Sequence, residues 1–155
     1  QRIDGILSVV PGYAGGHSKI TTYKEVCTGK TGHAEVAKIQ YNSDIITYEQ
    51  ILNVFWQAHD PTTLNRQGND VGTQYRSVIF YHNEEQKKIA INSQEKANKS
   101  GYWPNKIVTE LTEIFNYLDA EDYHNNYYDN NPNQPYCLFV IKPKLDKLID
   151  KGIIK

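Results

Sequence analysis

Residues 65–77 form the stretch of the sequence that is best suited to holding a ligand. The stretch has no hydrophobic period, and two glycines within it allow sharp turns. Asn, Asp, Gln, Tyr and Arg side chains surround these glycines, so the segment is dense with hydrogen-bonding groups. We expect a polar loop, neither helical nor extended in its first half, that is shaped to bind something.

Glu35 is the candidate for acid–base chemistry. It belongs to an alternating segment, residues 33–41, and shares one face of that segment with Ala37, Ile39 and Tyr41. If this face is buried, desolvation raises the pKa of Glu35 and keeps it protonated near neutral pH, as a general acid requires. The alternative is a glutamate at a strand end that reaches solvent or pairs with an arginine, and strand position alone favours this alternative.

Tyrosine is abundant, with twelve residues against four phenylalanines. Tyr23, Tyr75, Tyr127 and Tyr128 lie beside polar residues in predicted loops. A phenol is a neutral hydrogen-bond donor at ordinary pH, so these side chains could hold a polar oxygen without adding charge. For any single tyrosine, packing of a loop onto the core with the hydroxyl in water is the stronger interpretation.

The two cysteines are too few for a disulfide scaffold and too far apart for a zinc ribbon. Cys27 follows Val26 and is interpreted as a buried structural residue. Cys137 follows a segment rich in Asn and Pro, where an exposed thiol on a flexible stretch would suit disulfide exchange. The alternative for Cys137 is a strand residue together with residues 138–140.

Several functional classes receive no support from the sequence. The five histidines show no ligand spacing, and residues 12–16 lack the Lys-Ser/Thr end of a phosphate loop. His59 is interpreted as part of a hydrogen-bonding device at a helix end. A net charge of −1 and the lack of a long apolar run argue against binding nucleic acid or spanning a membrane, and cysteine usage favours the cytoplasm.

The pattern of elements predicts one α+β domain over residues 1–155, a two-layer sandwich with helices packed on a mixed or antiparallel sheet, a ferredoxin-like core and long ordered loops. Residues 1–5 read like the last turn of a helix, so we expect preceding residues in the natural protein and a domain truncated at its N-terminus. We predict strands over residues 6–10, 33–41, 76–81 and 107–112, a turn over 11–16, and helices over 47–58, 83–100, 120–128 and 143–152.

Ordered motifs along nearly the whole chain, from Gly5 to about Lys144, resemble the A-type peptide methionine sulfoxide reductase family. Together they are far more specific than any one alone. The matching motifs are Gly12-Tyr13-Ala14-Gly15-Gly16, Thr22-Tyr23-Lys24-Glu25-Val26-Cys27-Thr28-Gly29, Thr31-Gly32-His33-Ala34-Glu35-Val36, His59-Asp60-Pro61-Thr62-Thr63, Arg66-Gln67-Gly68-Asn69-Asp70 through Tyr75-Arg76-Ser77, and Asn131-Pro132-Asn133-Gln134-Pro135-Tyr136-Cys137.

The resemblance implies thiol-dependent reduction of methionine-S-sulfoxide, free or in proteins, to methionine, with no cofactor and with thioredoxin restoring the thiols. We expect a monomer. By position in the motifs, Glu35 is similar to the family's proton donor. Tyr23 and Tyr75 are similar to the phenols that bind the sulfoxide oxygen. Asp70 and Tyr127 are similar to substrate-binding residues, and Cys137 is similar to a resolving cysteine.

The chain departs from the family pattern at the nucleophile. The family's attacking thiol belongs to a Gly-Cys-Phe-Trp motif before the Gly12 turn, and nothing here matches it. We expect that motif upstream of Gln1. A non-catalytic protein that binds methionine sulfoxide on the same scaffold is the alternative. Without the resemblance, a hydrolase that pairs Glu35 with Asp70 would be a third hypothesis.

Overall fold

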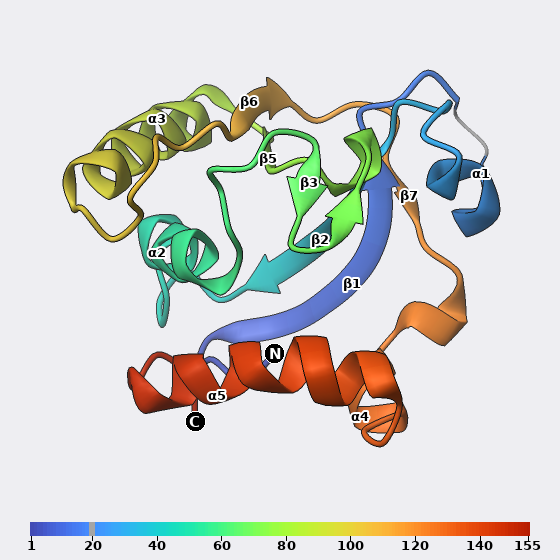
Figure 1. Cartoon of the computed structure of the whole chain (residues 1–155). Helices are drawn as coiled ribbons and strands as arrows, with labels where there is room; N and C mark the ends of the chain where they lie inside the picture. Colours follow the sequence, from blue (N-terminus) through green and yellow to red (C-terminus); the bar gives the residue numbers. More distant parts are fainter. Residues whose placement is uncertain (19–20) are drawn as a thin grey trace.

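The structure, a computed structural model, describes residues 1–18 and 21–155, and its central element is the long curved strand β1 (Ile6–Ala14) (Figure 1). β1 lies between β2 (Ala34–Tyr41) and β7 (Leu118–Asp119) in an antiparallel sheet of order β2-β1-β7. The predicted central strand is confirmed. The turn predicted over residues 11–16 is wrong for residues 11–14, which continue the strand, and the chain turns only from Gly15 on. Pro11 has no N–H to donate to the sheet, but its carbonyl accepts the Ala120 N–H at 2.9 Å.

The chain turns after β1 at a position where no side chain would fit. A Cβ atom added at Gly16 would lie 2.4 Å from the Thr31 carbonyl oxygen and 2.6 Å from the His33 ring. This close approach brings the end of β1 against the start of β2. His33 fixes the contact, because its Nδ1 accepts the Gly16 N–H at 3.2 Å.

β2 confirms the alternating strand predicted over residues 33–41 but not the burial of the face that carries Glu35. Glu35 itself is half-buried, whereas Ala37 and Ile39 on the same face are exposed. The middle of this face is therefore exposed, and Glu35 is partly buried at the end of β2 where it lies opposite Tyr13 of β1.

The helices α2 (Tyr48–Ala58) and α3 (Glu84–Lys99) pack beside the parallel pair β5 (Val78–Tyr81) and β6 (Glu110–Glu113) (Figure 1). The predicted capping box of α2 is confirmed, since the Thr47 hydroxyl accepts the Gln50 N–H at 3.1 Å. Both helices and both strands occur where predicted, although the strands begin later. Their shared core consists of Leu52, Trp56, Ile79, Ala90 and Ile107.

The polar segment 65–77 contains a small hairpin that the sequence analysis missed. β3 (Arg66–Gln67) pairs antiparallel with β4 (Asp70–Val71), so the prediction of a segment neither helical nor extended in its first half is wrong. Gly68 has a φ of +59°, a left-handed conformation that allows the tight turn between the two strands.

Two short helical turns replace the single helix predicted over residues 120–128. They are η2 (Asp122–His124) and α4 (Tyr127–Asn130), separated at Asn126, which has a φ of +52° and so interrupts the helical backbone. The last predicted helix is confirmed as α5 (Lys142–Asp150), which Figure 1 shows lying along one side of the molecule near both termini.

Helices mixed with small, mostly antiparallel sheets thus form the architecture, in agreement with the α+β prediction. Within the described parts of the chain, no helix combines the length and the apolar character needed to cross a membrane.

Candidate functional site

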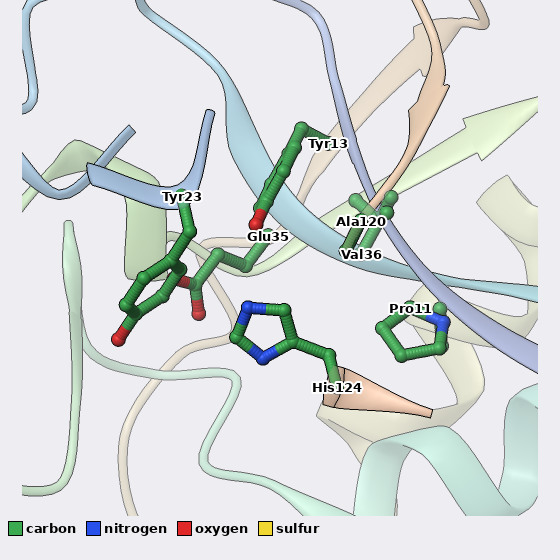
Figure 2. Close-up of a pocket in the computed structure, with 9 residues that line it drawn as sticks. Pro11, Tyr13, Tyr23, Glu35, Val36, Ala120 and His124 are labelled. Carbon is green, nitrogen blue, oxygen red and sulfur yellow. The ribbon is translucent and has the colours of Figure 1, made fainter. Parts of the chain in front are cut away.

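A cavity of about 270 Å³ lies where the end of β1, the start of β2 and the segment after β7 meet. Three polar side chains, those of Tyr23, Glu35 and His124, come from three different elements, and Figure 2 shows the carboxyl group of Glu35 near the rings of the other two. The remaining lining is largely apolar or backbone and comes from Pro11, Gly12, Tyr13, Val36, Ala37 and Ala120. The cavity is thus a mostly apolar space with a few polar groups, as small-ligand sites commonly are.

Glu35 has the properties predicted for a carboxyl group that holds its proton. Its Oε1 atom is buried and has no hydrogen-bond partner. Burial, and then the negative charge of Asp70, raise the pKa of Glu35 above its ordinary value. The raised pKa that was expected for a buried Glu35 is therefore found, although the cause is a local cavity and not a buried strand face. The alternative that strand position favoured, a glutamate that reaches solvent or pairs with an arginine, is wrong for this buried carboxyl oxygen.

Tyr23 was predicted in a loop, and this is wrong because it begins the helix α1 (Tyr23–Cys27). The signal was present in the sequence as a second capping box, in which the Glu25 N–H donates to the Thr22 hydroxyl and the Thr22 N–H donates to the Glu25 carboxylate. The Tyr23 N–H donates to Glu121 Oε1 at 2.7 Å, which fixes the helix start against the segment after β7.

Cys27 is exposed, so its interpretation as a buried residue is wrong. The helix α1 buries Val26 instead and leaves the thiol at its surface. A hydrogen bond with this thiol, then burial, and more weakly the charge of Glu35, raise the pKa of Tyr23. The Tyr23 phenol therefore stays neutral and able to donate a hydrogen bond beside Glu35.

Tyr75 and Asp70 approach Glu35 from the polar segment but do not line the cavity. Tyr75 ends the short helical turn η1 (Thr73–Tyr75) and not a loop. Burial first, and the charge of Glu35 second, raise the pKa of Tyr75. The neighbouring Gln74 connects η1 to α1, because its Nε2 donates to the Cys27 carbonyl at 3.2 Å.

Cys137 differs most from its prediction. It is fully buried and begins the π-helical turn η3 (Cys137–Ile141), which runs directly into α5. Both the exposed thiol and the alternative of a strand over residues 138–140 are therefore wrong, because the last helix begins earlier than Pro143 and turns the thiol inward. Cys137 does not line the cavity.

Tyr127 and Tyr136 differ in their relation to the site. Tyr127 begins α4 and is also outside the cavity. Tyr136, which the sequence analysis did not single out, has its pKa raised by burial and then by the charges of Asp70 and Glu35. The structure therefore places Tyr136 near the acidic pair, and its position directly before Cys137 was the only sequence signal.

Glu121 and His124 are site residues that sequence reasoning missed. Glu121 accepts the Tyr13 hydroxyl at 2.8 Å in addition to the Tyr23 N–H. Burial raises the pKa of Glu121, but these hydrogen bonds outweigh it and the net shift is downward. His124 lies one helical turn further along, with Nε2 3.4 Å from Glu121 Oε2. The signal was a glutamate and a histidine three positions apart within the helix predicted over residues 120–128, where the histidines were considered only as metal ligands.

His59, in another of the matching motifs, makes hydrogen bonds that stabilise the fold. The His59 Nδ1 donates to the Phe55 carbonyl at 2.6 Å, and its Nε2 lies 2.7 Å from the Ser77 hydroxyl. This confirms the predicted device at the end of α2. Over residues 1–18 and 21–155, no three His, Cys, Asp or Glu side chains are grouped so that they could hold a metal ion.

Comparison with known proteins identifies the family. The family model described as "Peptide methionine sulfoxide reductase" matches residues 1–155. The chain belongs to this family. The peptide methionine sulfoxide reductase MsrA of Saccharolobus solfataricus is 53% identical over 149 residues, 96% of this chain and 83% of that protein.

Solved structures of methionine sulfoxide reductases share the fold. The reduced form of Mxr1 from Saccharomyces cerevisiae matches with a TM-score of 0.81 and 40% identity over 86% of this chain and 76% of that chain. The methionine sulfoxide reductase A of Corynebacterium diphtheriae matches with a TM-score of 0.75 and 34% identity over 84% of this chain and 66% of that chain. The family predicted from the motifs is therefore confirmed.

Proposed function

We propose that the chain reduces methionine-S-sulfoxide, free or in proteins, to methionine, with Glu35 as the proton donor. Family membership supports the reaction. The observation that carries the role of Glu35 is its buried, unpartnered carboxyl oxygen in the cavity, together with its raised pKa. A neutral carboxylic acid there can protonate the sulfoxide oxygen as a thiolate attacks the sulfur.

The overall reaction consumes two thiols. The sulfoxide sulfur is reduced to a thioether and the attacking thiolate becomes a sulfenic acid that carries the oxygen. A second thiol then displaces that oxygen as water and forms a disulfide. Tyr23 and Tyr75 hold the sulfoxide oxygen through neutral phenols, and Asp70 and Tyr127 contribute to binding the substrate.

Cys137 is proposed as the resolving thiol, with thioredoxin as the reductant of the resulting disulfide. Its burial at the start of η3 means that this turn must open before the thiol can react. A short helical segment with a π-helical turn is a suitable place for such opening, since its hydrogen bonds are less regular than those of an α-helix.

The attacking thiol is assigned to neither Cys27 nor Cys137, because neither matches the family's nucleophile motif. The reaction is therefore proposed for the natural protein, including any residues that flank this sequence. We further propose a monomeric, cytoplasmic protein of one domain whose sheets and helices form a two-layer, ferredoxin-like core.

The deciding experiment measures reduction of the S and R epimers of methionine sulfoxide by the natural protein with dithiothreitol. We expect turnover of the S epimer. Binding of the S epimer without formation of methionine would instead support the alternative, a catalytically dead protein that binds methionine sulfoxide or a peptide on this scaffold.

A further inference from the structure

Two buried polar atoms in residues that line the cavity have no hydrogen-bond partner: Glu35 Oε1 and His124 Nε2. Buried polar groups are nearly always hydrogen-bonded, so unpartnered atoms on one cavity indicate a ligand group that satisfies them. The proposed reaction accounts for the unpartnered oxygen of Glu35, because this residue donates its proton to the sulfoxide. The same reaction assigns no role to His124.

The ring of His124 is held in a defined position. It packs against the Tyr23 ring at a centroid distance of 4.8 Å and against the Tyr123 ring at 4.2 Å. Its Nε2 lies 3.4 Å from Glu121 Oε2, at an angle that does not make a hydrogen bond. Glu121 is itself fixed by the Tyr13 hydroxyl and the Tyr23 N–H.

The nearby carboxylate of Glu121 favours one position for the proton on the His124 ring. A negative charge 3.4 Å from Nε2 favours the proton on that nitrogen over a lone pair. Nε2 is then a hydrogen-bond donor whether the imidazole is neutral or protonated. Because Glu121 does not accept this hydrogen in good geometry, the donor is buried and has no hydrogen-bond partner among the described residues.

Glu35 in its neutral form is also a donor, so the cavity presents two donors and needs an acceptor between them. The oxygen of a sulfoxide carries much negative charge and accepts several hydrogen bonds, whereas the thioether product is a weak acceptor. We propose that His124 is a further substrate-binding residue, whose Nε2–H donates to the sulfoxide oxygen alongside Glu35. This inference rests on the proposed function.

Two substitutions separate the donor of His124 from its aromatic packing. His124→Phe keeps a ring against Tyr23 and Tyr123 but has no donor, while His124→Gln keeps an amide donor but has no ring. With the natural protein and methionine-S-sulfoxide, in single turnover without reductant, we expect His124→Phe to lower the rate at subsaturating substrate by about 10²–10³-fold, as for loss of an oxyanion donor. We expect His124→Gln to recover part of this loss.

The opposite order, with His124→Phe near wild type and His124→Gln impaired, would show that only the ring matters and would overturn the proposal. Thermal unfolding of both variants shows whether they fold. If the proposed function itself is wrong, the wild-type protein forms no methionine at all. This outcome is distinct from failure of the His124 proposal, in which the wild type is active.

A measurement that leaves His124 intact provides a second test. In the Glu35→Gln variant, whose chemical step should be slow, the ¹⁵N resonance of His124 Nε2 is followed during titration to saturation with methionine-S-sulfoxide and, separately, with methionine. We expect a shift on binding the sulfoxide that methionine does not produce. An Nε2 resonance that responds equally to both ligands, or to neither, would overturn the donor role.

Discussion

Replacing Glu35 by Gln tests the central chemical assignment. The amide has nearly the same shape as the carboxylic acid and retains a hydrogen-bond donor in the cavity, but it cannot transfer a proton to the sulfoxide oxygen. Loss of a general acid typically lowers a rate by about 10²–10⁴-fold, which corresponds to roughly 3–5 kcal/mol in the activation barrier. We expect a loss of this size in the first turnover of the natural protein.

The pH dependence follows from the raised pKa of Glu35. As pH rises through this pKa the carboxyl group loses the proton it must donate, so the single-turnover rate of the wild type should fall. The Glu35→Gln variant should lack this descending limb.

Since the folded-state pKa of Glu35 lies above its unfolded-state value, the contribution of Glu35 to the free energy of unfolding is present at low pH and is lost as pH rises. Glu35→Gln should therefore increase stability at neutral pH and not at pH 4.

The assay is rapid-quench measurement of methionine formed from excess enzyme, without reductant, between pH 5 and 9. Glu95→Gln is a matched control, because it makes the same chemical change on the exposed surface of α3, and it should behave like the wild type. A Glu35→Gln rate within a few-fold of wild type, with the same pH profile, would refute the role of Glu35 as proton donor.

Three further predictions concern other parts of the chain. Cys137→Ser should leave the first turnover intact and abolish thioredoxin-driven recycling. Cys27→Ser, which changes an exposed thiol, should retain both. Recycling is measured as NADPH consumption with thioredoxin reductase, and normal recycling in Cys137→Ser would exclude Cys137 as the resolving thiol. Tyr23→Phe and Tyr75→Phe should each slow the first turnover by about tenfold, the effect of one hydrogen bond of roughly 1.4 kcal/mol, and unchanged rates would remove the phenols from oxygen binding. Burial lowers the pKa of His59, so its contribution to stability is present above the unfolded-state pKa and is lost as pH falls through the folded-state value; urea unfolding should show a smaller loss of stability between pH 7.5 and 5 in His59→Gln than in the wild type.

Local signals in the sequence were sufficient for elements that depend on neighbouring residues. The Thr47–Gln50 capping box predicted the start of α2, and Asn83 predicted the start of α3, because a cap is made within one helical turn. The same signal at Thr22 and Glu25 was overlooked, and α1 was missed for that reason alone.

Properties that depend on distant contacts were predicted less well. Cys27 and Cys137 exchanged their expected environments, because burial depends on which side of a helix faces the core and not on the immediate neighbours in sequence. Pro11 was predicted to end a strand that in fact continues, since only the pairing with β2 and β7 stabilises it there. Strand position favoured an exposed or arginine-paired Glu35, and its partial burial depends on contacts beyond its own strand.

The sequence by itself determined the family, the overall reaction and the residues that the motifs carry, because motif positions are preserved in order along the chain and can be recognised without a fold. Only the tertiary structure placed His124 in the same cavity as Glu35, with Glu121 next to His124. These residues are separated from Glu35 by more than eighty positions, and they meet it because β7 pairs with the same strand, β1, as β2 does. The polar segment 65–77 drew attention first, yet it contributes Asp70 and Tyr75 to the electrostatics of Glu35 from outside the cavity. These positions could not be predicted locally, because strand pairing and burial depend on residues that are far apart in the sequence.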